Sequence, residues 1–158
     1  MKFDLSSLII TVVALLAFII PVTFDQINKR KTSNTLKKLS TFAEKEKLNL
    51  DKSDVYQHTY ALGLDKRLKK IAYLNTNGNE SVGSTYDLNQ VSTCRFYQSD
   101  VTENGTDLRK ISFIKLQFKD SKTEPVELEI YKMMKNLSYT EEESMAKKMV
   151  KSINSMLA

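Results

Sequence analysis

The stretch Ile114-Lys115-Leu116-Gln117-Phe118, followed by Val126-Glu127-Leu128-Glu129-Ile130, alternates apolar with polar residues. Successive side chains of a β-strand point to opposite faces, so this period of two places one face in a core and the other in water. We therefore predict two strands of an antiparallel sheet, at Lys110–Lys119 and Val126–Lys132.

Three upstream runs are rich in β-branched and aromatic residues, which are common in strands. They cover Val55–Leu64, Arg67–Leu74 and Tyr86–Tyr97, the last with a break expected near Asn89. Asp65-Lys66 forms a tight link between the first two, and Asn75–Ser84 holds Asn-Gly and Gly-Ser turn signals. Strands spaced in this way favour an antiparallel meander over parallel βαβ units.

The chain ends in a predicted amphipathic helix that begins at Thr140. Thr140 and Glu143 have the spacing of a capping box, and Glu141–Glu143 lie at the positive end of the helix dipole. We expect one apolar stripe to pack on the sheet, where methionine side chains fill gaps. The stripe consists of Met145, Met149, Val150, Ile153, Met156 and Leu157. The basic residues come later, at Lys147, Lys148 and Lys151.

A strongly curved antiparallel sheet followed by one amphipathic helix is similar to the pleckstrin-homology-like superfold. In that superfold the C-terminal helix plugs one end of a split barrel, and the resemblance covers roughly Val55 to Leu157. More specifically, Tyr60–Asp65 and Lys69–Leu74 look like the first hairpin of uncharacterised single-pass membrane proteins common in Bacteroidetes, and Tyr86–Leu88 with Val91–Arg95 continue the match. The resemblance implies an α+β fold with a pleckstrin-homology-like antiparallel β-barrel or curved sheet. It implies no particular activity, because the superfold hosts lipid-headgroup, peptide and protein binding alike.

The N-terminal part contains an uncharged run of about 20 residues, from Leu5 to Phe24. A helix of that length crosses a hydrocarbon layer of about 30 Å, so we predict one transmembrane helix. A cleaved signal peptide is the alternative, but Pro21–Phe24 lacks the small-residue pattern that cleavage needs. Basic residues gather just after the run. They place the C-terminal domain on the cytoplasmic side of a bacterial inner membrane.

This prediction divides the chain into three parts. Residues 1–31 form the transmembrane anchor and its basic flank, residues 32–50 an amphipathic juxtamembrane helix, and residues 51–158 the pleckstrin-homology-like domain. In the second part Leu36, Leu39, Phe42 and Ala43 recur at helical spacing. That helix either packs on the domain or continues the anchor.

The residue types needed for catalysis are scarce. The 158 residues include 24 Lys and Arg against 19 Asp and Glu, a net charge of +5 without the basic block typical of nucleic-acid binding. There is one histidine, His58, expected on a strand, and one cysteine, Cys94, expected as a small buried side chain. No metal-binding, phosphate-loop or nucleophile motif occurs. We therefore predict no enzyme, no catalytic residue, no metal, no cofactor and no nucleic-acid partner.

The remaining interpretation is a noncatalytic interaction module, a scaffold or adaptor, held at a membrane. Its partners are the lipid bilayer, through the N-terminal helix, and a membrane protein of unknown identity that docks on an exposed sheet edge or beside the final helix. The alternatives are direct binding of anionic lipid headgroups and a membrane-associated enzyme. The candidate lipid surface consists of Lys29, Arg30, Lys31, Lys37, Lys38, Lys66, Arg67, Lys69 and Lys70.

Overall fold

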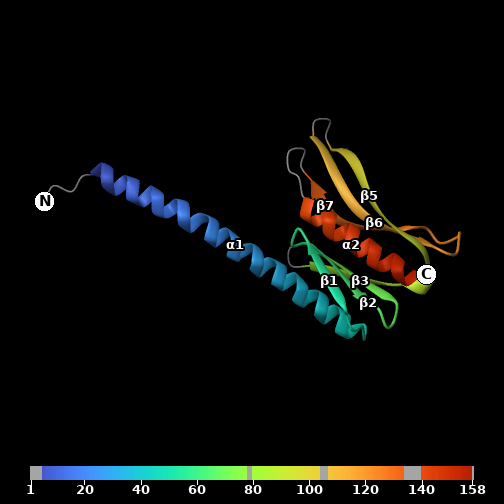
Figure 1. Cartoon of the computed structure of the whole chain (residues 1–158). Helices are drawn as coiled ribbons and strands as arrows, with labels where there is room; N and C mark the ends of the chain where they lie inside the picture. The colour runs from blue at the N-terminus through green and yellow to red at the C-terminus, as the bar shows by residue number, and fades with distance from the viewer. Residues whose placement is uncertain (1–4, 78–79, 104–106, 134–139, 158) are drawn as a thin grey trace. The chain divides into compact units, whose positions relative to one another are not determined.

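The computed structural model describes residues 5–77, 80–103, 107–133 and 140–157 (Figure 1). The chain divides into two compact units, residues 1–34 and residues 35–158. Helix α1, Leu5–Lys45, begins in the first unit and ends in the second. The described part of the second unit combines helices with antiparallel sheets and is therefore α+β.

The strands form two antiparallel sheets (Figure 1). The four-stranded sheet has the order β1-β2-β3-β4, and the three-stranded sheet has the order β5-β6-β7. The strands are β1 Lys52–Tyr56, β2 Tyr60–Asp65, β3 Lys70–Asn77, β4 Glu80–Asp87, β5 Val91–Glu103, β6 Asp107–Phe118 and β7 Val126–Met133. A 3-10 helix, η1, Leu88–Gln90, joins β4 to β5, and the C-terminal helix α2 spans Thr140–Leu157.

The larger hydrophobic core contains residues of both sheets and of α2, which Figure 1 shows lying across them. Leu62 and Leu64 of β2 belong to this core together with Ile114 and Leu116 of β6. The predicted packing of the α2 stripe is confirmed, because all six of its residues belong to this core or pack against it. They are Met145, Met149, Val150, Ile153, Met156 and Leu157.

The four-stranded sheet has a second buried face, which residues 35–45 of α1 cover. Strand β2 is buried along its whole length, because alternate side chains enter two different clusters. The second cluster contains Leu39, Ala43, Leu48, Ala61, Ala72 and Leu74. Small residues on this face let the helix and the following segment approach. A Cβ atom at Gly63 would overlap Leu50, and one at Gly83 would overlap the ring of Phe42.

Two side-chain amides join the outer strands of the three-stranded sheet to other elements. Asn154 of α2 accepts a hydrogen bond from the backbone N–H of Cys94 on β5 at 3.0 Å and donates one to its carbonyl at 2.8 Å. Gln57, between β1 and β2, makes the same pair of bonds with Lys132 of β7, at 2.9 and 2.8 Å. The amides therefore fix the positions of α2 and of the β1–β2 turn relative to this sheet.

A buried carboxylate holds the β2–β3 turn. Asp65 is 0% exposed and accepts hydrogen bonds from the backbone N–H groups of Asn49 at 2.7 Å and Leu68 at 2.8 Å. Burial alone would raise the pKa of Asp65. These bonds and the positive charge of Arg67 outweigh burial, so the pKa lies below its ordinary value. The turn is thus tied to the segment that follows α1.

The predicted transmembrane helix at Leu5–Phe24 is wrong. A spanning helix needs about 20 consecutive, predominantly apolar residues. No helix within the described residues is long and apolar enough to cross a membrane. The predicted location as a single-pass protein of the bacterial inner membrane, with a cytoplasmic C-terminal domain, is wrong for the same reason. Segment 32–50, predicted as an amphipathic helix that packs on the domain or continues the preceding segment, is part of the continuous helix α1 up to Lys45, where the helix ends.

The predicted antiparallel β-barrel or curved sheet is also corrected, because the strands form two antiparallel sheets. The run Val55–Leu64 contains two strands rather than one, since the chain reverses at Gln57 and His58, which both have positive φ. His58 therefore lies in a turn, where its carbonyl accepts a hydrogen bond from the Thr35 hydroxyl at 2.6 Å.

Three other boundaries differ from the prediction. Residues 67–69 belong to a turn, so the link after β2 is longer than Asp65-Lys66. Most of Asn75–Ser84, predicted as a connection, lies in β3 and β4, and residues 78–79 are outside the described residues. The break near Asn89 is the helix η1, so Tyr86–Tyr97 spans two strands. The alternating strands at the end of the sheet, β6 and β7, are confirmed.

The substitution Asp65→Asn should destabilise the fold by about 1–3 kcal/mol at neutral pH, because hydrogen bonds to a buried charge are lost. The folded-state pKa of Asp65 is lowered, so ionised Asp65 stabilises the fold above the unfolded pKa of about 3.9. This contribution disappears as the pH falls through the lower folded pKa. Urea unfolding at several pH values should therefore show that the difference in unfolding free energy between wild type and variant shrinks below about pH 4.

The control substitution Glu124→Gln, at an exposed position, should change the unfolding free energy little. A constant difference down to acid pH would contradict the assignment.

The substitution Gly83→Ala should lower the free energy of unfolding by about 1–3 kcal/mol, because the new methyl group overlaps the Phe42 ring. The same substitution should cost less in a Phe42→Leu background, where the ring is absent. A double-mutant cycle from denaturant unfolding measures this coupling. Ser81→Ala, at an exposed position of the same strand, is the matched control. Equal costs in both backgrounds would rule out the proposed contact.

Candidate functional site

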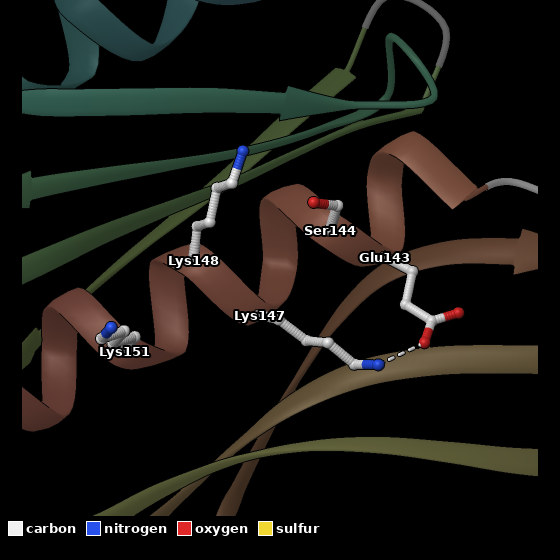
Figure 2. A pocket seen from close by; sticks show the side chains of 5 residues that line it. All are labelled: Glu143, Ser144, Lys147, Lys148 and Lys151. Carbon is white, nitrogen blue, oxygen red and sulfur yellow. Dashed lines mark hydrogen bonds and ion pairs between the residues drawn. The ribbon is translucent and has the colours of Figure 1, made fainter.

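The exposed side of α2 carries a basic groove (Figure 2). It is a solvent-open pocket of about 480 Å³ lined by Glu143, Ser144, Lys147, Lys148 and Lys151, and we call it the α2 groove. Ala146, Met149 and Ile153 are buried in the core on the other side of the helix. The apolar stripe that anchors α2 therefore also turns the lysines toward solvent.

The three lysines of the α2 groove differ in their surroundings. Lys147 forms an ion pair with Glu143, one helical turn away, at 2.5 Å, and its Nζ lies 5.8 Å from the ring centroid of Phe96. Figure 2 shows Lys148 pointing away from that pair. Within the described part of the chain, neither Lys148 nor Lys151 has an acidic partner. The groove therefore presents two positive charges that no described carboxylate neutralises.

A second, smaller pocket lies on the outer face of β5 and β6. It has a volume of about 240 Å³, and we call it the sheet pocket. Its lining residues are Thr93, Arg95, Tyr97, Lys115 and Gln117. The strand register pairs Arg95 with Lys115 and Thr93 with Gln117. The residues between them, Cys94 and Leu116, point into the core.

Aromatic contacts hold one side of the sheet pocket. The rings of Tyr97 and Phe113 stack with centroids 5.9 Å apart and an interplanar angle of 1°, yet Tyr97 remains 46% exposed. Lys115 Nζ lies 5.7 Å from the Tyr97 centroid and 2.9 Å from Glu127 Oε1. Arg95 is exposed and makes no ion pair with any residue the structure describes.

The nine predicted lipid-surface residues are spread over both units. Lys29, Arg30 and Lys31 belong to unit 1–34, where they are exposed. Lys37 and Lys38 are exposed on α1 within unit 35–158, as are Lys66 and Arg67 on the β2–β3 turn, whereas Lys69 and Lys70 are half-buried. None of the nine lines the α2 groove or the sheet pocket. Their role at a lipid surface stays a prediction.

The sequence predicts docking beside the final helix but does not single out the residues of either pocket. Lys147, Lys148 and Lys151 are given no binding role there, although their position opposite an apolar stripe is a usable signal. The sheet pocket had no such signal, since Arg95 and Lys115 come together only through the register of β5 and β6.

The buried thiol and phenol groups of the core, which could otherwise act as nucleophiles, stay protonated at neutral pH. Cys94 is 2% exposed, which confirms the expectation of a small buried side chain, and burial raises its pKa to about 12. Burial also raises the pKa of Tyr56 and of Tyr60, and Tyr60 additionally donates a hydrogen bond to Glu129. Among the described residues no group of three His, Cys, Asp or Glu is arranged to hold a metal ion. The two pockets therefore offer binding contacts rather than these nucleophiles.

Cys94 should react far more slowly with a disulfide reagent such as DTNB in the folded protein than in the unfolded protein. At pH 8 a thiol of pKa about 12 is about one ten-thousandth thiolate, against about a quarter for an ordinary thiol. We expect the rate to differ at least a hundredfold between native buffer and denaturant. Rates within tenfold of each other would show that the thiol is accessible and ionised in the fold.

Comparisons with protein-family models, with curated proteins and with solved structures found no match to this chain. The resemblance to membrane proteins of Bacteroidetes therefore stays a prediction based on the quoted residues alone.

Proposed function

We propose that this chain is a noncatalytic binding module that docks an acidic segment of a protein partner in the α2 groove. The supporting observation is that Lys148 and Lys151 lack an acidic partner among the described residues and line the same solvent-open pocket. Residues three positions apart on a helix have neighbouring side chains. The two lysines thus leave neighbouring positions of the helix, from which their ammonium groups can bind separate carboxylates of an acidic segment.

The rigidity of α2 makes this surface suitable for recognition. Three side chains of the helix, Ala146, Met149 and Ile153, are fully buried, and Asn154 bonds it to β5. A partner would therefore meet lysine Cα positions that are already fixed, so only the lysine side chains lose freedom on binding. The pairing of Glu143 with Lys147 adds selectivity, because it limits the free positive charge to one part of the groove.

Electrostatics set the expected strength of such a contact. Each exposed ion pair contributes at most about 1 kcal/mol, so affinity should be modest. Screening by salt should weaken it further. The net charge of +5 favours encounter with anionic partners in general, so the test must separate local from overall attraction.

The double substitution Lys148→Glu with Lys151→Glu should lower the affinity of the full-length chain for an acidic peptide at least tenfold. The probe is a fluorescein-labelled dodecapeptide of alternating Glu and Ser, followed by fluorescence anisotropy at low salt. The matched control is Lys119→Glu with Lys122→Glu, which changes the net charge equally at exposed positions outside the groove. The control should cost less than threefold, and a Gln-for-Glu peptide should not bind.

Equal losses in the two double variants would show unspecific charge attraction and contradict the α2 groove as the site. Anionic phospholipid vesicles provide the alternative outcome. If the wild-type chain binds vesicles but not the peptide, and Lys66→Glu with Arg67→Glu reduces vesicle binding while the α2 double variant binds vesicles normally, headgroup binding replaces the proposal.

A further inference from the structure

Every described side chain that lines the sheet pocket carries a hydrogen-bond donor. The donors are the guanidinium of Arg95, the ammonium of Lys115, the hydroxyls of Thr93 and Tyr97 and the amide of Gln117. None of these lining side chains is a carboxylate. We propose that the sheet pocket is a second, independent site, which binds a phosphoryl group of a ligand.

The strand register places two like charges opposite each other. Arg95 on β5 and Lys115 on β6 are cross-strand partners, and like charges at such positions destabilise a sheet. Glu127 on β7 is in turn the cross-strand partner of Lys115 and pairs with it at 2.9 Å. These three cross-strand side chains carry two positive charges and one negative charge. One positive charge therefore has no counter-charge among the described residues. An oxyanion held between Arg95 and Lys115 would relieve the repulsion between them.

The number of donors favours a phosphoryl group over a single carboxylate. Arginine presents a planar fork that bonds two oxygens of a phosphate or of a carboxylate at once, which leaves the other donors of the pocket for further oxygens. A phosphoryl group offers three strong acceptor oxygens and a charge of about −1.5 to −2, which matches a pocket rich in donors. The stacking of Tyr97 on Phe113 limits the movement of the Tyr97 ring and so fixes where its hydroxyl lies.

The sheet pocket and the α2 groove lie on different sides of the three-stranded sheet. Cys94 and Leu116 alternate with the pocket residues and point into the core that contains the apolar stripe of α2. The pocket residues themselves face away from that core. Occupation of one site therefore leaves the other open, and this inference does not rest on the proposed function.

Isothermal titration calorimetry of the full-length chain tests the proposal with three probes. They are inorganic phosphate, a hexapeptide containing phosphoserine with its unphosphorylated counterpart, and vesicles containing a phosphoinositide. Arg95→Gln should lower the affinity for the tightest-binding probe at least tenfold, and Lys115→Met at least fivefold. The matched control Lys119→Gln removes a charge from an exposed position outside the pocket and should change affinity less than twofold.

The same titration separates this site from the α2 groove. The variant carrying Lys148→Glu and Lys151→Glu should retain the affinity within a factor of three. The probe that binds tightest identifies whether the phosphoryl group belongs to a free ion, a protein or a lipid. No saturable binding of any probe would overturn the proposal, as would binding that Arg95→Gln leaves unchanged while its melting temperature equals that of the wild type.

Discussion

Strand β2 is buried on both of its faces, and the packing needed to cover those two faces organises the second unit. One face receives the last turns of α1 and Leu50 of the segment that follows, which approach closely because Ala61, Gly63 and Ala72 carry little or no side chain. The other face contributes leucines to the core shared with the second sheet and α2. Since burial of apolar area is the main favourable term in folding, the fold and the orientation of α2 follow from the same requirement.

Periodicity predicts those strands that have one wet face. β6 and β7 alternate clearly, because their outer side chains reach solvent. The alternation of buried and exposed residues fails in β2, because Ala61 and Gly63 are as buried as Leu62. The sequence pattern therefore does not reveal the turn between β1 and β2. That turn uses Gln57 and His58 at positive φ in place of glycine or asparagine. The sequence predicts residues 80–84 of β4 as a connection, because Gly83, which accommodates Phe42, resembles a turn residue.

The two candidate sites differ in how many of their residues the sequence alone can predict. The α2 groove lies on a single helix, so its lysines follow from the same period that predicts the apolar stripe. The sheet pocket depends on which residue of β6 stands opposite Arg95, and a shift of one position would turn Lys115 into the core. Basic clusters that are visible in the sequence, such as Lys66–Lys70, line neither pocket.

The amides of Asn154 and Gln57 also affect how one molecule meets another. An open strand edge presents unpaired N–H and C=O groups, which can template a strand from a neighbouring chain and start aggregation. At Cys94 on β5 and Lys132 on β7, both groups are already bonded to a side chain that cannot continue a ladder. Each outer strand of the three-stranded sheet is thus terminated at one position, where growth into an intermolecular sheet is blocked.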